Sequence, residues 1–234
     1  MIRCSIRLSA WDPAVYTFLR ETSMATEIEL KARITNPKTL MERIDAFAQA
    51  LGSYVKEDAY WRPGAVPPSA GSAGSEPRGA DPRGTGSPSP EALGSGVRIR
   101  REAWDSDDPQ WVVNFKRKEV RDGLEVNDER EFAVSDIGAF EELLERFGLQ
   151  MWIRKRKSGR AWNFKDMTIE VSEVAGLGWF AELEIIAENN SEATVDAARK
   201  KLLDMLVRLE IPKESIEDRY YTEMLAALAH IPLP

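Results

Sequence analysis

Apolar and charged residues alternate without interruption in the stretch Glu27-Ile28-Glu29-Leu30-Lys31, close to the start of the chain. Successive side chains of a β-strand point to opposite faces, so the alternation predicts a strand with one apolar face and one charged face. The charged face holds two carboxylates and one ammonium group. Taken alone, such a face is more typical of a strand exposed to solvent, and the rest of the chain changes that interpretation.

The same kind of pattern recurs further along the chain. Strands are predicted over residues 55–61, 97–102, 111–118, 124–134, 161–165, 167–174 and 179–187. Several of these strands have a polar face that is charged, and those faces hold Arg98, Arg100, Lys116, Lys118, Glu129, Glu131, Glu182 and Glu184.

One further segment, 152–157 with the sequence WIRKRK, predicts a strand but leaves its buried face open. Lys155 and Lys157 share a face with Ile153, and the two arginines lie on the other face. The alternation therefore does not decide which charged pair points inward.

Helical spacing of apolar residues predicts a first helix over residues 37–51. Asn36 is suited to cap its start, Pro37 to occupy its first position and Gly52 to end it. The strand predicted over 55–61 follows this helix directly.

A second helix is expected after Ser135, which we interpret as its N-cap, and before Gly148, which we interpret as its end. Its buried stripe is predicted to consist of Phe140, Leu143, Leu144 and Phe147. Two more helices are expected at the end of the chain, over 191–209 and from 212 to about 229.

The element order therefore gives eight or nine strands, mostly in hairpin order, and four helices. This order predicts an α+β fold with a closed or strongly curved antiparallel sheet that is flanked by helices. A mixed-charge face that recurs across such a sheet predicts a charged lumen.

Domain organisation is indicated by two segments without clear periodicity. Residues 62–96 are dominated by Gly, Pro, Ser and Ala, and so predict a disordered insert that interrupts one domain. A linker between two independent domains is the alternative. Residues 1–24 are interpreted as an N-terminal extension, because Met24 is a candidate start of translation. Residues 25–230 are interpreted as the single domain.

Composition excludes several classes of function. The 234 residues carry a net charge of -7, which argues against a general nucleic-acid-binding protein. One cysteine and one histidine leave no basis for a disulfide framework, a Cys/His zinc site or a catalytic triad centred on His. No apolar run reaches membrane-spanning length and no signal peptide is recognisable. We therefore expect a cytoplasmic protein without a nucleic-acid or membrane partner.

A lumen lined by clustered Arg and Lys is suited to hold a polyanion, because guanidinium and ammonium groups bind phosphate oxygens. Carboxylates in the same lumen would repel a phosphate chain unless a divalent cation lies between them. Mg²⁺ or Mn²⁺ held by carboxylates and by the substrate's own phosphate oxygens is the usual arrangement. The residues therefore predict a metal-dependent site for a triphosphate.

The motif Glu27-x-Glu29-x-Lys31 resembles the EXEXK signature of the CYTH superfamily, which includes class IV adenylyl cyclases, thiamine triphosphatases and inorganic triphosphatases. Later segments match the superfamily's motifs in order, namely Val97 to Arg100, Phe115-Lys116, Glu129 to Asp136, Lys155 with Lys157, Val174 to Glu184, and Arg219 to Tyr221. The resemblance covers roughly residues 25–225, apart from the insert.

This resemblance implies a triphosphate tunnel, which is a closed antiparallel barrel of eight strands. It implies catalytic roles for Glu27, Glu29 and Lys31. It implies metal ligation by Glu27, Glu29, Glu182 and Glu184. Phosphate binding would fall to Lys31, Arg98, Arg100, Lys116, Lys118, Lys155 and Lys157. The remaining tunnel residues would be Glu129, Glu131 and Glu170.

The expected substrate is a small-molecule triphosphate, either ATP, tripolyphosphate or thiamine triphosphate, and a homodimer is left open. The segment from Gly176 to Glu184 more closely resembles the class IV cyclases, which favours conversion of ATP to cyclic AMP and pyrophosphate. Hydrolysis of a terminal phosphate is the alternative, and a non-catalytic polyphosphate- or nucleotide-binding module is the third hypothesis. Ser172 stands where the cyclases usually have Asp, and Glu170, on the same strand face, is a candidate to compensate for it.

Overall fold

The computed structural model describes residues 26–64, 96–105, 107–121 and 123–231; within these ranges, the side chains of 116–119, 121, 128 and 129 are not described. The described residues form eight strands, β1 (Thr26–Arg33), β2 (Gln49–Pro63), β3 (Val97–Trp104), β4 (Gln110–Arg121), β5 (Leu124–Ala133), β6 (Leu149–Phe164), β7 (Met167–Val174) and β8 (Gly178–Ala187). They also form the helices α2 (Pro37–Asp45), α3 (Ile137–Arg146), α4 (Glu192–Arg208) and α5 (Tyr221–Ala229), and a short 3₁₀ turn, η2 (Lys213–Ser215).

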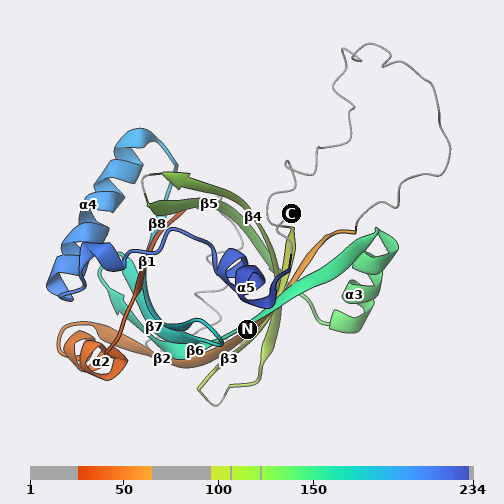
Figure 1. Ribbon diagram of the computed structural model, residues 1–234, viewed down its shortest axis with the longest axis horizontal. Helices are drawn as coiled ribbons and strands as arrows, with labels where there is room; N and C mark the ends of the chain where they lie inside the picture. Colours follow the sequence, from red (N-terminus) through yellow and green to blue (C-terminus); the bar gives the residue numbers. More distant parts are fainter. Residues whose placement is uncertain (1–25, 65–95, 106, 122, 232–234) are drawn as a thin grey trace, which may run out of the picture.

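The strands form one curled antiparallel sheet, as Figure 1 shows. They pair in the order β1-β5-β4-β3-β2-β6-β7-β8, and β1 pairs with both β5 and β8, so the ring of strand pairs closes into a barrel. The α+β class and the antiparallel arrangement that the sequence predicted are therefore confirmed. Helices α2 and α4 lie outside the sheet, whereas α5 lies across one opening of the ring (Figure 1).

The main hydrophobic core lies outside the barrel, between the sheet and helices α2 and α4. Ile28 and Leu30 of β1 and Trp162 of β6 are buried there, together with Ile44 of α2 and Leu202 of α4. Each fully buried large side chain of this kind stabilises the fold by about 1.5–3 kcal/mol. This core therefore fixes the apolar face of β1 outward and its charged face toward the barrel interior.

The first predicted helix is correct at its start and wrong at its end. Asn36 caps α2 by accepting a hydrogen bond from the Thr39 amide at 3.4 Å, but the helix stops at Asp45. The apolar residues that continue the helical spacing lead into β2, which pairs along its length with β6. Gly52 lies inside β2 at an irregularity in that pairing, where its φ of +129° suits glycine. Long-range strand pairing therefore overrides the local helical period.

Helix α3 also differs from the prediction. Its N-cap is Asp136 rather than Ser135, because the Asp136 carboxylate accepts the Ala139 amide at 3.0 Å. Of the predicted stripe only Leu144 is buried, whereas Leu143 is 45 % and Phe147 is 74 % exposed. The helix packs one narrow side on a small cluster of β2, β3 and β4 residues. Fewer of its own apolar side chains are therefore buried than their helical spacing predicts.

Two further boundaries are corrected. The strands predicted over 152–157 and 161–165 form one continuous strand, β6. The last helix begins at Tyr221 rather than at Pro212, and η2 fills part of the space between. The predicted N-terminal extension and residues 65–95 of the predicted insert lie outside the described residues. None of the described helices is both long enough and apolar enough to cross a membrane.

Candidate functional site

Strand β1 is buried on both of its faces. Its apolar residues lie in the outer core, while Glu27 and Lys31 on the opposite face are only 4 % and 2 % exposed. Burial of charged groups is costly unless they are paired or hydrogen-bonded, so this face must meet other polar groups. It meets them in the interior of the barrel, which we call the lumen.

The orientation of β6, which the sequence left open, is resolved by burial. Lys155 and Lys157 are buried in the lumen at 7 % and 4 % exposure, whereas Arg154 and Arg156 are exposed on the outside. The two lysines therefore lie on the inner face together with Ile153, as alternation along the strand requires.

A first lumen cluster consists of Tyr54, Lys56, Lys157, Glu170 and Glu182. The Nζ atoms of Lys56 and Lys157 lie 2.8 Å and 2.5 Å from the Glu170 carboxylate, and the Tyr54 hydroxyl donates to the same carboxylate at 2.7 Å. Lys157 also donates to Glu182. The five side chains come from β2, β6, β7 and β8, so the cluster links four strands.

Both signs of charge are held firmly in this cluster. Burial alone lowers the pKa of Lys157, but the Glu170 and Glu182 carboxylates oppose it and raise the pKa well above its usual value. Burial raises the pKa of Glu170, but Lys157 and Lys56 outweigh it and hold the pKa well below the usual range. Lys157 therefore stays a cation and Glu170 an anion at neutral pH.

A second lumen cluster is centred on Asp58 of β2. Arg100 of β3 donates to the Asp58 carboxylate through Nε at 2.7 Å and through Nη2 at 3.1 Å. The Lys155 Nζ lies 3.1 Å from the same carboxylate. Burial favours a neutral Asp58, yet Arg100 and Lys155 hold its pKa well below the usual range. This cluster therefore carries two cations around one anion.

Helix α5 contributes to the lumen from the barrel opening. The Tyr221 hydroxyl donates to the Glu182 carboxylate, and the ammonium groups of Lys31 and Lys155 lie 5.1 Å and 5.0 Å from the centre of the Tyr221 ring. Lys31 also forms an ion pair of 2.6 Å with Glu125 of β5.

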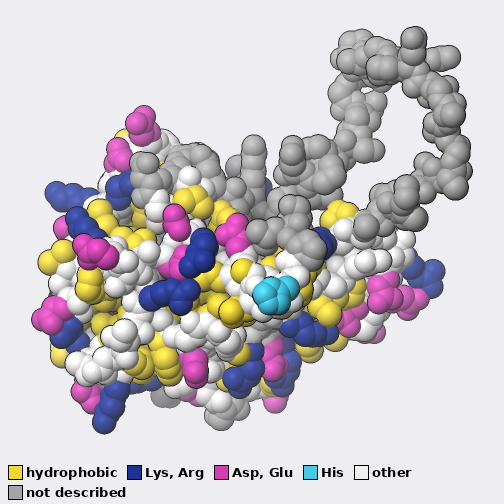
Figure 2. Space-filling view, viewed as in Figure 1, with side chains coloured by type: hydrophobic (Ala, Val, Ile, Leu, Met, Phe, Trp, Pro, Cys, Tyr) yellow, Lys and Arg dark blue, Asp and Glu magenta, His cyan; other side chains and the backbone are white. Residues whose placement is uncertain are grey.

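On the outer surface, acidic and basic side chains are interspersed over the face that Figure 2 shows, without a large area of one sign.

Among the sequence-predicted site residues, the structure brings several into contact with one another or with a shared partner, namely Lys31, Arg100, Lys155, Lys157, Glu170 and Glu182. The side chains of Lys116, Lys118 and Glu129 lie outside the described residues, although the backbone register sets Lys116 opposite Glu129. Glu131 lies opposite Asn114 on β4, and Arg98 lies opposite the same residue from β3.

The family model for the CYTH domain matches residues 86–221, which is more than half of the chain. The chain belongs to the CYTH domain family. The match begins after the Glu27 to Lys31 stretch, and β1 joins the barrel of this CYTH domain through its pairing with β5 and β8. A search of curated proteins found no match.

Several solved structures share the fold of this CYTH domain. The PH1819 protein from Pyrococcus horikoshii OT3 is 20% identical, with a TM-score of 0.68, over 86% of this chain and 99% of that one. A candidate adenylate cyclase from Vibrio parahaemolyticus is 16% identical, with a TM-score of 0.59, over 86% and 97%. HpAC1 from Hippeastrum, a candidate adenylyl cyclase described as having a dominant triphosphatase activity, is 15% identical, with a TM-score of 0.55, over 90% and 98%.

The carboxylates of the lumen are chemically suited to a divalent metal, although none of the described residues forms a ready group of three or more acidic, Cys or His ligands. Glu29 and Glu184 lie directly opposite each other on β1 and β8, and Glu27 is the next inward residue along β1. Mg²⁺ is often held by one or two carboxylates plus phosphate oxygens, which this pair fits. Glu182 already accepts from Lys157 and Tyr221, so its predicted role as a ligand requires those contacts to loosen.

Sequence reasoning did not assign several lumen residues, which are Tyr54, Lys56, Asp58, Glu102 and Glu125. A signal existed for each of them. Tyr54, Lys56 and Asp58 alternate along β2, and Glu102 and Glu125 continue the alternation of predicted charged faces on β3 and β5. The polar neighbours on the outer face of β2 hid the pattern, because both faces of that segment carry charge.

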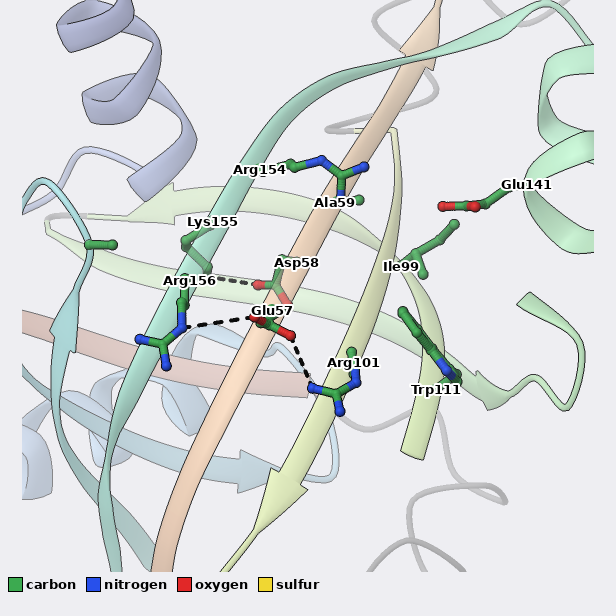
Figure 3. A pocket seen from close by; sticks show the side chains of 11 residues that line it. Glu57, Asp58, Ala59, Ile99, Arg101, Trp111, Glu141, Arg154, Lys155 and Arg156 are labelled. Carbon is green, nitrogen blue, oxygen red and sulfur yellow. Dashed lines mark hydrogen bonds and ion pairs between the residues drawn. The ribbon is translucent and has the colours of Figure 1, made fainter. Parts of the chain in front are cut away.

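A groove of about 410 Å³ lies between β2, β3, β6 and α3, and Figure 3 shows its lining residues. Its charged side chains include Glu57, Arg101, Arg154 and Arg156. Glu57 is 3.1 Å from Arg101 and 3.8 Å from Arg156 and so pairs with both. Lys155 is the only predicted phosphate-binding residue in the lining, so the lumen, rather than this groove, is the candidate site.

Proposed function

We propose that the lumen of this CYTH domain binds the triphosphate chain of a small molecule together with Mg²⁺ or Mn²⁺, and that the protein catalyses a reaction of that triphosphate. The observation that carries the proposal is the burial of three lysines, Lys31, Lys155 and Lys157, at 2 %, 7 % and 4 % exposure in a barrel interior. A protein that needed only stability would be served as well or better by apolar side chains at such positions.

The basic residues of the lumen have the geometry for phosphate binding. Arg100 and Lys155 flank Asp58 in the second cluster, and Lys56 and Lys157 lie in the first cluster, so cations reach the lumen from β2, β3 and β6. Phosphate oxygens would accept the remaining N–H groups of these cations. When no phosphate is bound, the carboxylates that pair with these cations offset the repulsion between the positive charges in the lumen.

The divalent metal would be held by Glu29 and Glu184, which face each other across β1 and β8, with Glu27 beside them. When bound, it would neutralise charge on the phosphate oxygens and polarise the phosphorus centre. Lys31 lies on the same face as these carboxylates. Burial lowers the pKa of Lys31, but Glu125 and Glu29 raise it above the usual value, so Lys31 stays a cation that orients phosphate.

The reaction that we propose first is that of the class IV adenylyl cyclases. The oxygen of the ribose 3′-hydroxyl of ATP would form a bond to the α-phosphorus while the hydroxyl proton passes to solvent. The bond from that phosphorus to the bridging oxygen would break, and pyrophosphate would leave. The support is the resemblance of the segment from Gly176 to Glu184, which runs from the β7–β8 turn into β8, to the corresponding segment of the class IV cyclases.

Hydrolysis of a terminal phosphate is the second candidate. A water oxygen would form a bond to the terminal phosphorus while a water proton passes to solvent. The bond from that phosphorus to the bridging oxygen would break, which yields orthophosphate and a substrate shortened by one phosphate group. Two observations favour it: the described lumen clusters consist of charged and phenolic side chains that suit a bare polyphosphate, and HpAC1, which shares the fold, is described as having dominant triphosphatase activity.

Product analysis tests both candidates. The purified chain is supplied with Mg²⁺ or Mn²⁺ and, in separate reactions, with ATP, tripolyphosphate or thiamine triphosphate. Cyclic AMP with pyrophosphate supports the first candidate, and orthophosphate released fastest from tripolyphosphate or thiamine triphosphate supports the second. Triphosphate binding without any product would contradict catalysis and support a binding module.

A further inference from the structure

Asp58 occupies the centre of a row of three charged residues on neighbouring strands. In the strand register it lies directly opposite Arg100 of β3 on one side and directly opposite Lys155 of β6 on the other. Its side chain has no exposed surface, and both of its oxygens are engaged, Oδ1 by Arg100 and Oδ2 by Arg100 and Lys155. The Tyr60 hydroxyl lies 3.4 Å from Oδ2 as an additional donor.

The row carries a net charge of +1, since Asp58 neutralises only one of its two cations. Arg100 uses Nε and Nη2 on Asp58, and its Nη1 lies 3.8 Å from Glu102. A Lys ammonium group has three donors, of which one is directed at Asp58. Each cation therefore keeps donors that Asp58 does not use.

Glu57, the residue before Asp58 on β2, provides a comparison with a carboxylate on the outer face of the barrel. Glu57 lies opposite Arg101 of β3 and Arg156 of β6, so it forms the same kind of row on the outer face of the same strands. Figure 3 shows both carboxylates, with Asp58 joined to Lys155 and Glu57 joined to Arg101 and Arg156. The Glu57 side chain is 46 % exposed, and water can replace its partners.

We propose that Asp58 is a positioning residue that acts as an internal counter-anion. It holds Arg100 and Lys155 side by side when no phosphate is bound, and it shares them with the phosphate chain when one is bound. The proposal rests on the proposed function of the lumen. This role differs from a merely structural one, because it predicts that a bound polyanion and the Asp58 carboxylate neutralise the charges of the same two cations, Arg100 and Lys155.

The consequence can be stated for Asp58→Asn, which keeps the shape and removes the charge. Without ligand, two buried cations lose their anion, so the variant is less stable than the wild type. With tripolyphosphate, the added anion takes over that compensation, so the variant gains more stability from the ligand than the wild type does. Removal of one nearby negative charge should also tighten tripolyphosphate binding by about 10-fold.

The test measures melting temperature and tripolyphosphate affinity for the full chain, for Asp58→Asn and for the matched control Glu57→Gln. Support requires a larger ligand-induced rise in melting temperature and a lower Kd for Asp58→Asn, with Glu57→Gln equal to the wild type. An Asp58→Asn variant whose Kd is unchanged or higher would overturn the proposal.

A second measurement applies if Asp58→Asn does not fold in buffer without tripolyphosphate. Asp58→Asn is then refolded from urea with and without tripolyphosphate. Recovery of folded protein only with tripolyphosphate supports the proposal, and failure to recover with it contradicts it. A wild type whose melting temperature does not respond to tripolyphosphate contradicts the proposed function itself, which separates that failure from a failure at Asp58.

Discussion

Glu29 on β1 and Glu184 on β8 lie directly opposite each other on two paired strands whose inward faces are charged. Directly opposite residues of an antiparallel pair have Cβ atoms about 4.5–5.5 Å apart, so their carboxylates can reach one ion together. The next pair along these strands, Lys31 with Glu182, places a cation beside them. In the site that we propose, these two carboxylates would hold the metal against a bound phosphate chain.

Replacement of Glu29 by Gln should abolish turnover while the protein stays folded, because the amide keeps the shape but removes the charge that holds the metal. Loss of one such electrostatic contact should lower kcat by about 100-fold or more. The measurement is the steady-state rate at a range of Mn²⁺ concentrations, with circular dichroism to verify the fold. Glu173→Gln, on the exposed face of β7, is the control and should keep the wild-type rate. Full activity in Glu29→Gln would refute the metal assignment.

Replacement of Lys157 by Met should destabilise the protein by about 3–5 kcal/mol, because it leaves the buried carboxylates of Glu170 and Glu182 without their shared cation. Urea unfolding measures this difference. Arg154→Ala, on the exposed outer face of the same strand, should change the stability by no more than about 0.5 kcal/mol. Equal effects of the two substitutions would show that burial in the lumen is not the cause.

Acid should remove part of the stability. The pKa of Glu217 is lowered from 4.5 to about 2, first by its hydrogen bond to Arg219 and then by that to Arg33. Because the folded value lies below the unfolded one, this contribution is present above pH 4.5 and is lost as the pH falls toward 2. Denaturation of the wild type and of Glu217→Gln, followed by fluorescence, should give a difference of about 1–2 kcal/mol at pH 7. That difference should shrink below pH 4.5, and a constant difference would contradict the assignment.

Replacement of Ser172 by Ala should have little effect. The Ser172 side chain is buried and its hydroxyl oxygen has no hydrogen-bond partner among the described residues, so its removal breaks no hydrogen bond there and relieves an unsatisfied polar group. We expect stability that is unchanged or up to about 1 kcal/mol higher, and unchanged activity. A large loss of activity would instead mean that the hydroxyl takes part in the reaction.

The sequence predicted most of the lumen face because alternation along strands is a local property. Glu27, Glu29 and Lys31 could be assigned to one face from five residues, and the outer core then explains why that face turns inward. The α+β class followed from the order of strand and helix patterns. Alternation left the WIRKRK segment undecided because both of its faces are basic, and Lys155 and Lys157 were assigned to phosphate binding only through the resemblance. Packing of the neighbouring strands is what distinguishes the two faces.

The features that the sequence did not reveal depend on contacts between distant segments. Asp58 meets Arg100 and Lys155, which lie 42 and 97 positions later in the chain, and no local pattern joins them. The end of α2 at Asp45 is likewise set by the pairing of β2 with β6 rather than by the apolar spacing up to Leu51. Helix boundaries and lumen partners therefore needed the three-dimensional arrangement.

The most direct test of the central claim is a crystal structure of the full chain soaked with Mn²⁺ and tripolyphosphate, with diffraction recorded at the manganese absorption edge. The account predicts an anomalous peak beside Glu29 and Glu184, with phosphate density within hydrogen-bond distance of Lys31, Arg100 and Lys155. Density confined to the outer groove beside Arg154 and Arg156, with an empty lumen, would contradict it.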